Sequence, residues 1–250
     1  MSLNIDNWLV SEKFEQMGRY LTLLHTAISE NQKQLDASIE KVASTMSDDE
    51  KEGFYDAYED EFIEAGADFP RLLFSSFVVS WYSFVENQLI SFCKSQELKI
   101  SISIQDNEYY GEGIRRAYNF LNRAVGYQID NEHWKELIRI GKTRNKIVHN
   151  GGRLPYSNFN VPNNGVPVTI DDYLSIPIKE EVILYLQIEE DLYKYLQTHQ
   201  LLEFSGLFQI TPTYEYCEHL VKFGLEFFGK LYKDFSKESE TQHQRTEGGG

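Results

Sequence analysis

Residues 144–152, Arg-Asn-Lys-Ile-Val-His-Asn-Gly-Gly, bring together the side chains of this chain that are best suited to chemistry. Arg144 carries a guanidinium, which can hold a phosphate group through two parallel hydrogen bonds. His149 can take up or release a proton near neutral pH without a metal ion. These two functions are the minimum needed to cleave RNA with the RNA's own 2′-hydroxyl as the nucleophile.

The segment stands at the end of a predicted helix that spans residues 131–149. Asp130 is a suitable N-terminal cap, and Gly151 tolerates the left-handed conformation that closes a helix. At about 100° per residue, polar and apolar side chains separate onto two faces. One face carries Lys135, Arg139, Lys142, Lys146 and His149, and the opposite one carries Trp134, Leu137, Ile140, Ile147 and Val148.

Arg144 falls in the middle of the apolar face of this helix. A charge in that position needs a carboxylate partner, and Glu86 is the candidate because it lies on the flank of another predicted apolar helix. Half of a buried ion pair is therefore an alternative role for Arg144.

The spacing of Arg144 and His149 limits how they can act together. His149 lies roughly 140° from Arg144 around an ideal helix, so the two side chains do not share a face. Asn145 and His149 are four residues apart and do share one. One ligand must therefore lie across the helix end, or a second subunit must complete the site. The alternative for His149 is a favourable interaction with the helix dipole alone.

The charge distribution predicts a narrow site for an anion. The formal net charge of −15 argues against a general affinity for nucleic acids. Between Lys135 and Arg153 the balance reverses, because six basic residues there accompany a single acid, Glu136. We expect four of the basic residues to contact RNA, namely Arg139, Lys142, Lys146 and Arg153.

Apolar residues recur at helical spacing along almost the whole chain, which predicts an all-α fold. The strongest pattern lies in an expected helix over residues 70–95, which should span the core. Its apolar residues are Phe74, Phe77, Val78, Trp81, Val85, Leu89 and Phe92. The other expected helices cover residues 11–43, 47–65, 114–125, 178–199 and 213–235. Residues 100–104 alternate in polarity and suggest a short strand, and residues 66–70 suggest a break between helices.

These elements suggest one helical core with additions at both ends. We expect N-terminal helices packed on the core (residues 1–69), a helical core (70–200) with a loop or small hairpin at 154–176, a C-terminal helix (201–235) and a disordered polar tail (236–250).

The composition predicts a soluble cytoplasmic protein. With 41% hydrophobic and 14% aromatic residues the chain can build a core, and no apolar run approaches the roughly 20 residues that span a bilayer. Cys93 and Cys217 both lie in apolar helical patterns, so we expect two buried thiols in a reducing compartment. The N-terminus has no basic region followed by an apolar one, as a secretory signal would.

Other metal-capable residues form no recognisable ligand set in the sequence. The two short groups are His133 with Glu136, and Glu215 with Cys217, Glu218 and His219. Neither offers three or four ligands at a spacing typical of a metal site. We therefore predict no metal and no cofactor.

Arg144, Asn145 and His149, preceded by the aromatic-rich segment 74–89, resemble the motif of the HEPN superfamily of small α-helical proteins. The resemblance covers roughly residues 70–199 and includes a loop or hairpin after the motif helix, as in several branches of the superfamily. It implies a helical bundle of HEPN type with extra N- and C-terminal helices.

In that superfamily the Arg-x4-6-His motif is implicated in metal-independent RNA cleavage, often at a symmetric dimer interface. By this resemblance Arg144 and His149 would be catalytic, and Asn145 would support their orientation. Glu86 would be an accessory polar residue. The resemblance also implies a homodimer formed through the motif helix, RNA as the ligand and a role in toxin or phage-defence systems. It leaves room for a regulatory protein partner.

One position departs from a branch of the superfamily. Members that are silenced by adenylylation carry a tyrosine two positions after the histidine, and here that position is Gly151. This difference argues against control by a nucleotidyltransferase at this site.

Two alternatives to a ribonuclease stay open at this point. The superfamily includes members that bind or scaffold without cutting, so the first alternative is a catalytically inert dimeric interaction or RNA-binding module. The second is an enzyme that acts on a small nucleotide at the basic helix face.

Overall fold

The computed structural model describes residues 3–106, 108–154, 189–204 and 208–247. This part of the chain is almost entirely helical, which confirms the predicted all-α class. The predicted insertion at 154–176 lies outside the described residues, except for Leu154. The first part of the helix expected at 178–199 also lies outside them.

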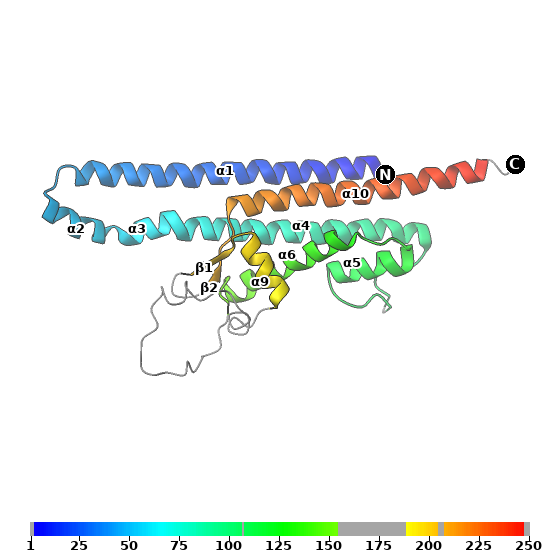
Figure 1. Ribbon diagram of the computed structural model, residues 1–250. Coiled ribbons are helices and arrows are strands. Elements are labelled where there is room, and N and C mark those ends of the chain that lie inside the picture. Colours follow the sequence, from blue (N-terminus) through cyan, green and yellow to red (C-terminus); the bar gives the residue numbers. More distant parts are fainter. Residues whose placement is uncertain (1–2, 107, 155–188, 205–207, 248–250) are drawn as a thin grey trace, which may run out of the picture.

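Three long helices form the body of the molecule: α1 (Leu3–Ala43), α4 (Phe69–Ile100) and α10 (Tyr214–Glu247). They lie side by side, and α1 runs opposite to the other two (Figure 1). On the side of α4 away from α1 lie the shorter helices α5 (Ile114–Phe120), α6 (Asn131–Asn150) and α9 (Glu190–Thr198). Helices α5 and α6 pack directly against α4, and α9 packs against α6.

The core forms where the three long helices meet. All seven apolar residues predicted to line α4 are buried there. The ring of Phe14, on α1, contacts Phe84 of α4 and Phe228 of α10, with ring centres 5.0 and 5.8 Å away. The helical spacing of apolar residues therefore identified the face of α4 that the other helices cover.

The chain between α1 and α4 is more continuous than the sequence suggests. It passes through α2 (Asp48–Ala57) and α3 (Glu59–Ile63), and then through a π-helical segment, η1 (Glu64–Asp68), directly into α4. The break expected at 66–70 is therefore wrong. Pro70 has no N–H to donate to the fourth preceding carbonyl, and the wider π-helical turn accommodates that loss without ending the helix.

Two further expectations at chain segments differ from the structure. Residues 100–104 form the end of α4 and a turn instead of a strand, because Ser101 adopts a left-handed conformation with φ 57°. Helix α10 continues to Glu247, where a disordered tail was expected from residue 236. Residues 236–247 contain no Gly or Pro, and seven of the twelve are Glu, Gln, Lys or Arg, which are good helix formers.

A small antiparallel hairpin that the sequence did not predict precedes α10. Strand β1 (Leu202–Phe204) pairs with β2 (Phe208–Ile210). The chain that leaves α6 joins this sheet, because Ile210 N–H donates to the carbonyl of Gly152 and Leu154 N–H donates to that of Phe208. The hairpin thereby fixes the direction of the chain at the C-terminal end of α6.

Two simpler expectations concern cysteines and membranes. Cys93 and Cys217 are both buried free thiols, as predicted. Among the helices that the structure describes, none combines the length and the apolar character needed to cross a bilayer.

Candidate functional site

Helix α6 begins and ends as its sequence predicts. The Asp130 carboxylate accepts hydrogen bonds from the backbone N–H groups of Glu132 and His133, at 3.1 and 3.3 Å. At the other end Gly151 is left-handed, with φ 60°, and closes the helix directly after Asn150. Both ends of the motif helix are therefore defined by local sequence.

Close packing of α6 on α4 places an aromatic ring beside the motif. Gly141 is buried, and a Cβ atom there would lie 2.6 Å from the hydroxyl oxygen of Tyr82 on α4. Because Gly141 has no side chain, Tyr82 can pass over α6, and the guanidinium carbon of Arg144 lies 5.8 Å from the centre of its ring. Burial, together with the charge of Glu86, raises the pKa of Tyr82 to about 12, although Arg144 and Arg115 oppose the shift.

The expected ion pair between Arg144 and Glu86 is not formed. Both residues are described, and no ion pair joins them; Arg144 Nη1 instead donates to Oδ1 of Asn145 at 2.9 Å. The Glu86 carboxylate lies against the backbone of Gly113, at the N-terminus of α5. A negative charge is favoured at the N-terminus of a helix, and Gly113 leaves room for the carboxylate. Glu86 therefore interacts with α5 and not with Arg144 of α6.

Asn145 connects Arg144 to the face of α6 that carries His149. Asn145 and His149 are both exposed and lie one turn apart, while Arg144 is half-buried. The guanidinium of Arg144 therefore points away from the middle of the apolar face and lies at the edge of the face that carries His149. Its buried Nε has no hydrogen-bond partner among the described residues. A cation and a titratable imidazole thus lie on adjoining parts of one helix end.

The basic face of α6 is narrower than the sequence predicts. Arg139 donates to both carboxylate oxygens of Asp191, at 3.0 and 2.6 Å, and Lys142 forms an ion pair with Glu189. These two of the four expected RNA contacts are therefore neutralised by acids next to or within α9. Within the described ranges, neither Lys146 nor Arg153 forms an ion pair.

Gln209 holds the glycine pair after the motif, a role that no pattern in the sequence predicts. This residue of β2 is only 8% exposed. Its Nε2 donates to the carbonyl of Gly151 at 3.3 Å, and its Oε1 accepts from Nη1 of Arg71 on α4 at 2.8 Å. Since Arg71 also pairs with Asp68, at 2.7 Å, the end of the motif helix is tied to the start of α4.

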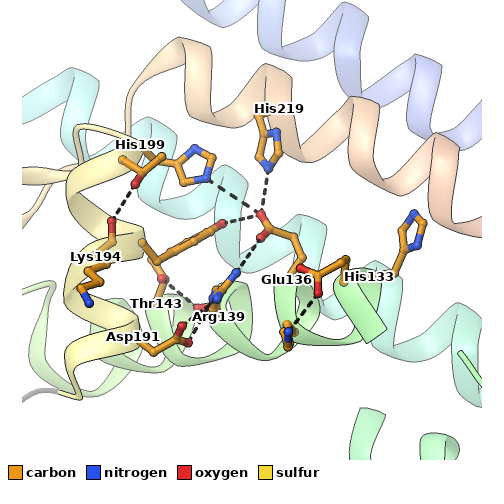
Figure 2. A network of polar contacts seen from close by, with 12 residues as sticks. His133, Glu136, Arg139, Thr143, Asp191, Lys194, His199 and His219 are labelled. Atoms are coloured by element: carbon orange, nitrogen blue, oxygen red, sulfur yellow. Dashed lines mark hydrogen bonds and ion pairs between the residues drawn. The ribbon is translucent and has the colours of Figure 1, made fainter. Parts of the chain in front are cut away.

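A second polar cluster lies nearer the start of α6. Glu136 Oε1 accepts hydrogen bonds from the Tyr195 hydroxyl at 3.0 Å and from His219 Nε2 at 2.9 Å, and His199 Nε2 lies 4.0 Å away (Figure 2). His199 follows α9 directly, and His219 belongs to α10. The sequence offered Glu136 and His219 in two separate groups, and only the fold joins them.

The environment of this cluster favours an ionised Glu136. Burial raises the pKa of Glu136, but hydrogen bonds from His219 and Tyr195 and the charges of the two histidines outweigh burial and place the pKa below its ordinary value. Burial lowers the pKa of His199, and the neighbouring His219 lowers it further against the attraction of Glu136.

Comparison of the chain with protein-family models, with curated proteins and with solved structures finds no match to any of them.

Proposed function

We propose that this protein is a metal-independent endoribonuclease of HEPN type, with its site at the C-terminal end of α6. The observation that carries the proposal is the contact between Arg144 and Asn145, one turn before an exposed His149. The contact turns the guanidinium, which would bind the phosphate, toward the helix face of His149, which would transfer the proton. The resemblance of residues 144–149 to the HEPN motif supports the same assignment.

In the proposed reaction His149 removes the proton from a ribose 2′-hydroxyl, whose oxygen then attacks the adjacent phosphorus. Arg144 stabilises the negative charge that develops on the phosphate oxygens, and Asn145 holds the guanidinium in place. The bond from phosphorus to the 5′-oxygen breaks, which leaves a 2′,3′-cyclic phosphate. The departing oxygen needs a proton, and the His149 of a second chain in a homodimer would supply it.

One observation favours this proposal over an inert binding module. The inert alternative relied on Arg144 as half of a buried pair with Glu86, and no such pair is present. A role in a toxin or phage-defence system, and a regulatory partner, follow from the resemblance alone.

The direct test is to incubate the purified protein with mixed RNA in excess EDTA. We expect cleavage to persist, to yield cyclic phosphate ends, and to stop at a site where the nucleotide 5′ to the scissile phosphate carries deoxyribose. His149→Ala should abolish cleavage and change stability by at most about 1 to 2 kcal/mol, because an exposed histidine at a helix end contributes little more.

His25→Ala is a matched control, since His25 is also exposed but lies on α1, and its cleavage should equal that of the unaltered protein. Cleavage that requires a divalent metal, or full cutting of the deoxyribose substrate, contradicts the mechanism. RNA binding without any cutting would favour the inert module.

A further inference from the structure

We propose that Glu136, His199 and His219 form a binding site for one divalent first-row transition-metal ion such as Zn²⁺. The three side chains come from α6, from the residue after α9 and from α10, and they converge on one point (Figure 2). The bound ion would fasten the ends of α9 and α10 to α6. This inference does not depend on the proposed ribonuclease activity.

The positions of the donor atoms suit a tetrahedral ion. All three donor atoms lie within 4.8 Å of one another, and Glu136 Oε1 lies 2.9 Å from His219 Nε2 and 4.0 Å from His199 Nε2. Ligands about 2.0 to 2.2 Å from a tetrahedral zinc ion lie about 3.3 to 3.6 Å from each other, a range between these two distances. An ion would therefore draw the His199 ring closer to Glu136 and move the His219 ring slightly away from it.

A second layer of contacts holds the carboxylate in place. The Tyr195 hydroxyl donates to Glu136 Oε1 and lies 3.2 Å from the hydroxyl of the buried Tyr216. Such outer contacts orient metal ligands in known sites. Arg139 Nη1 lies 3.9 Å from Glu136 Oε2, but Asp191 already binds the same guanidinium and offsets its charge.

The ligand types select the ion. Two imidazoles and one carboxylate suit zinc and its first-row neighbours, whereas Mg²⁺ and Ca²⁺ prefer oxygen ligands alone. The side chains of Glu136, His199 and His219 are 17%, 21% and 38% exposed, so an ion can enter from solvent and keep a water as its fourth ligand.

The site is separate from the motif at the end of α6. His149 follows Glu136 by roughly 20 Å of helix, at about 1.5 Å per residue, which is too far for the ion to touch the proposed reacting phosphate. The expected role of the ion is therefore to stabilise the packing of three helices, and cleavage in EDTA would not conflict with it.

The test titrates the full chain, freed of metal by a chelator, with Zn²⁺ by calorimetry and with Co²⁺ by visible absorption. We expect one ion per chain, the intense visible bands of four-coordinate Co²⁺, a higher midpoint of thermal unfolding with Zn²⁺ and no competition from excess Mg²⁺. If the folded, metal-free chain takes up neither Zn²⁺ nor Co²⁺, the proposal is wrong.

His199→Gln and His219→Gln probe the ligands with little change to the network. A glutamine amide can replace the hydrogen bond that His219 donates to Glu136, and His199 Nε2, at 4.0 Å, donates none to it. Each should weaken Zn²⁺ binding by more than about 100-fold, beyond the loss typical of outer contacts. If both variants fold, as judged by circular dichroism, and retain the original affinity, the proposal is overturned. If a variant does not fold, the titrations of the unaltered chain decide the outcome.

His133→Gln is the matched control on α6. His133 Nδ1 lies 3.1 Å from Asp130 Oδ1, and its Nε2 lies 3.5 Å from Glu226 Oε1. Because its two nitrogens face different carboxylates, they do not converge on one ion, and the Zn²⁺ affinity should be unchanged. A loss equal to that of the His219 variant would place the ion elsewhere and contradict the assignment.

Discussion

Arg144 is held by an aromatic ring and an amide instead of a carboxylate. Its guanidinium lies over Tyr82, and its Nη1 binds Asn145. A guanidinium can keep these contacts and still present a second edge to a phosphate, which a compact ammonium cannot do. Arg144 is therefore not required as the counter-ion of a buried acid.

This arrangement predicts the effect of Arg144→Lys. The charge is retained but the two-pronged contact is lost, so we expect the cleavage rate to fall about 100-fold or more. The free energy of unfolding should fall by about 0.5 to 2 kcal/mol, the scale of a half-buried cation–π contact. Single-turnover cleavage and urea unfolding measure the two effects. A loss of about 3 to 5 kcal/mol would instead indicate a broken buried pair.

Glu136 should make stability depend on pH. Its pKa in the folded chain lies below the ordinary value of 4.5, so its stabilising contribution is complete above that pH and is lost as the pH falls through the folded-state value. In a chelator, the unaltered chain should therefore be more stable than Glu136→Gln at pH 7, and the difference should shrink below about pH 4.5. Urea unfolding across this range tests the sign, and a constant difference would contradict it.

At the scale of whole helices, close approach depends on glycines at particular contacts. Gly224 of α10 faces Phe14 of α1, and a Cβ atom there would lie 2.6 Å from Cζ of that fully buried ring. The same helix carries Gly229, where an added Cβ would have no neighbour within 4 Å. Alanine substitutions at Gly224 and Gly229 therefore distinguish two effects on stability, the packing of α10 on α1 and the helix propensity of alanine.

Gly224→Ala should therefore lower the free energy of unfolding by about 1 to 3 kcal/mol, because Phe14 cannot move away from the overpacked contact. Gly229→Ala should raise the same free energy by about 0.5 to 1 kcal/mol, since alanine favours a helix. Urea unfolding of the two variants gives both values. Equal effects would mean that α10 does not pack on α1 at this position.

Each chain supplies one Arg144 and one His149, whereas the proposed reaction uses two histidines. A two-fold pairing of two α6 helices would bring both copies to one cleft. We therefore expect light scattering to report about twice the chain mass of 29.2 kDa.

Mixing two inactive proteins tests whether the sites are shared. If each site takes Arg144 from one chain and His149 from the other, chains with His149→Ala and chains with Arg144→Ala should regain some cleavage on mixing. Either protein mixed with itself serves as the control. An active protein that is strictly monomeric would exclude the shared cleft.

Local sequence alone determined the buried face of α4 and the two ends of α6, although it predicted neither the continuity of η1 with α4 nor the end of α10. The apolar spacing of α4 identified its buried face, and Asp130 and Gly151 defined α6, because periodicity, capping and left-handed closure depend on neighbouring residues. The motif 144–149 is also readable from sequence, since its residues share one helix end.

Only the tertiary structure decided which distant side chains meet. Glu86 lies against Gly113 and not beside Arg144, and Gln209 donates a hydrogen bond to the carbonyl of Gly151. Two histidines from other segments lie next to Glu136. Each outcome depends on how helices far apart in sequence cross, and a one-dimensional pattern contains no information about those crossings. The motif could therefore be predicted from local spacing, whereas its partners and the cluster at Glu136 required the fold.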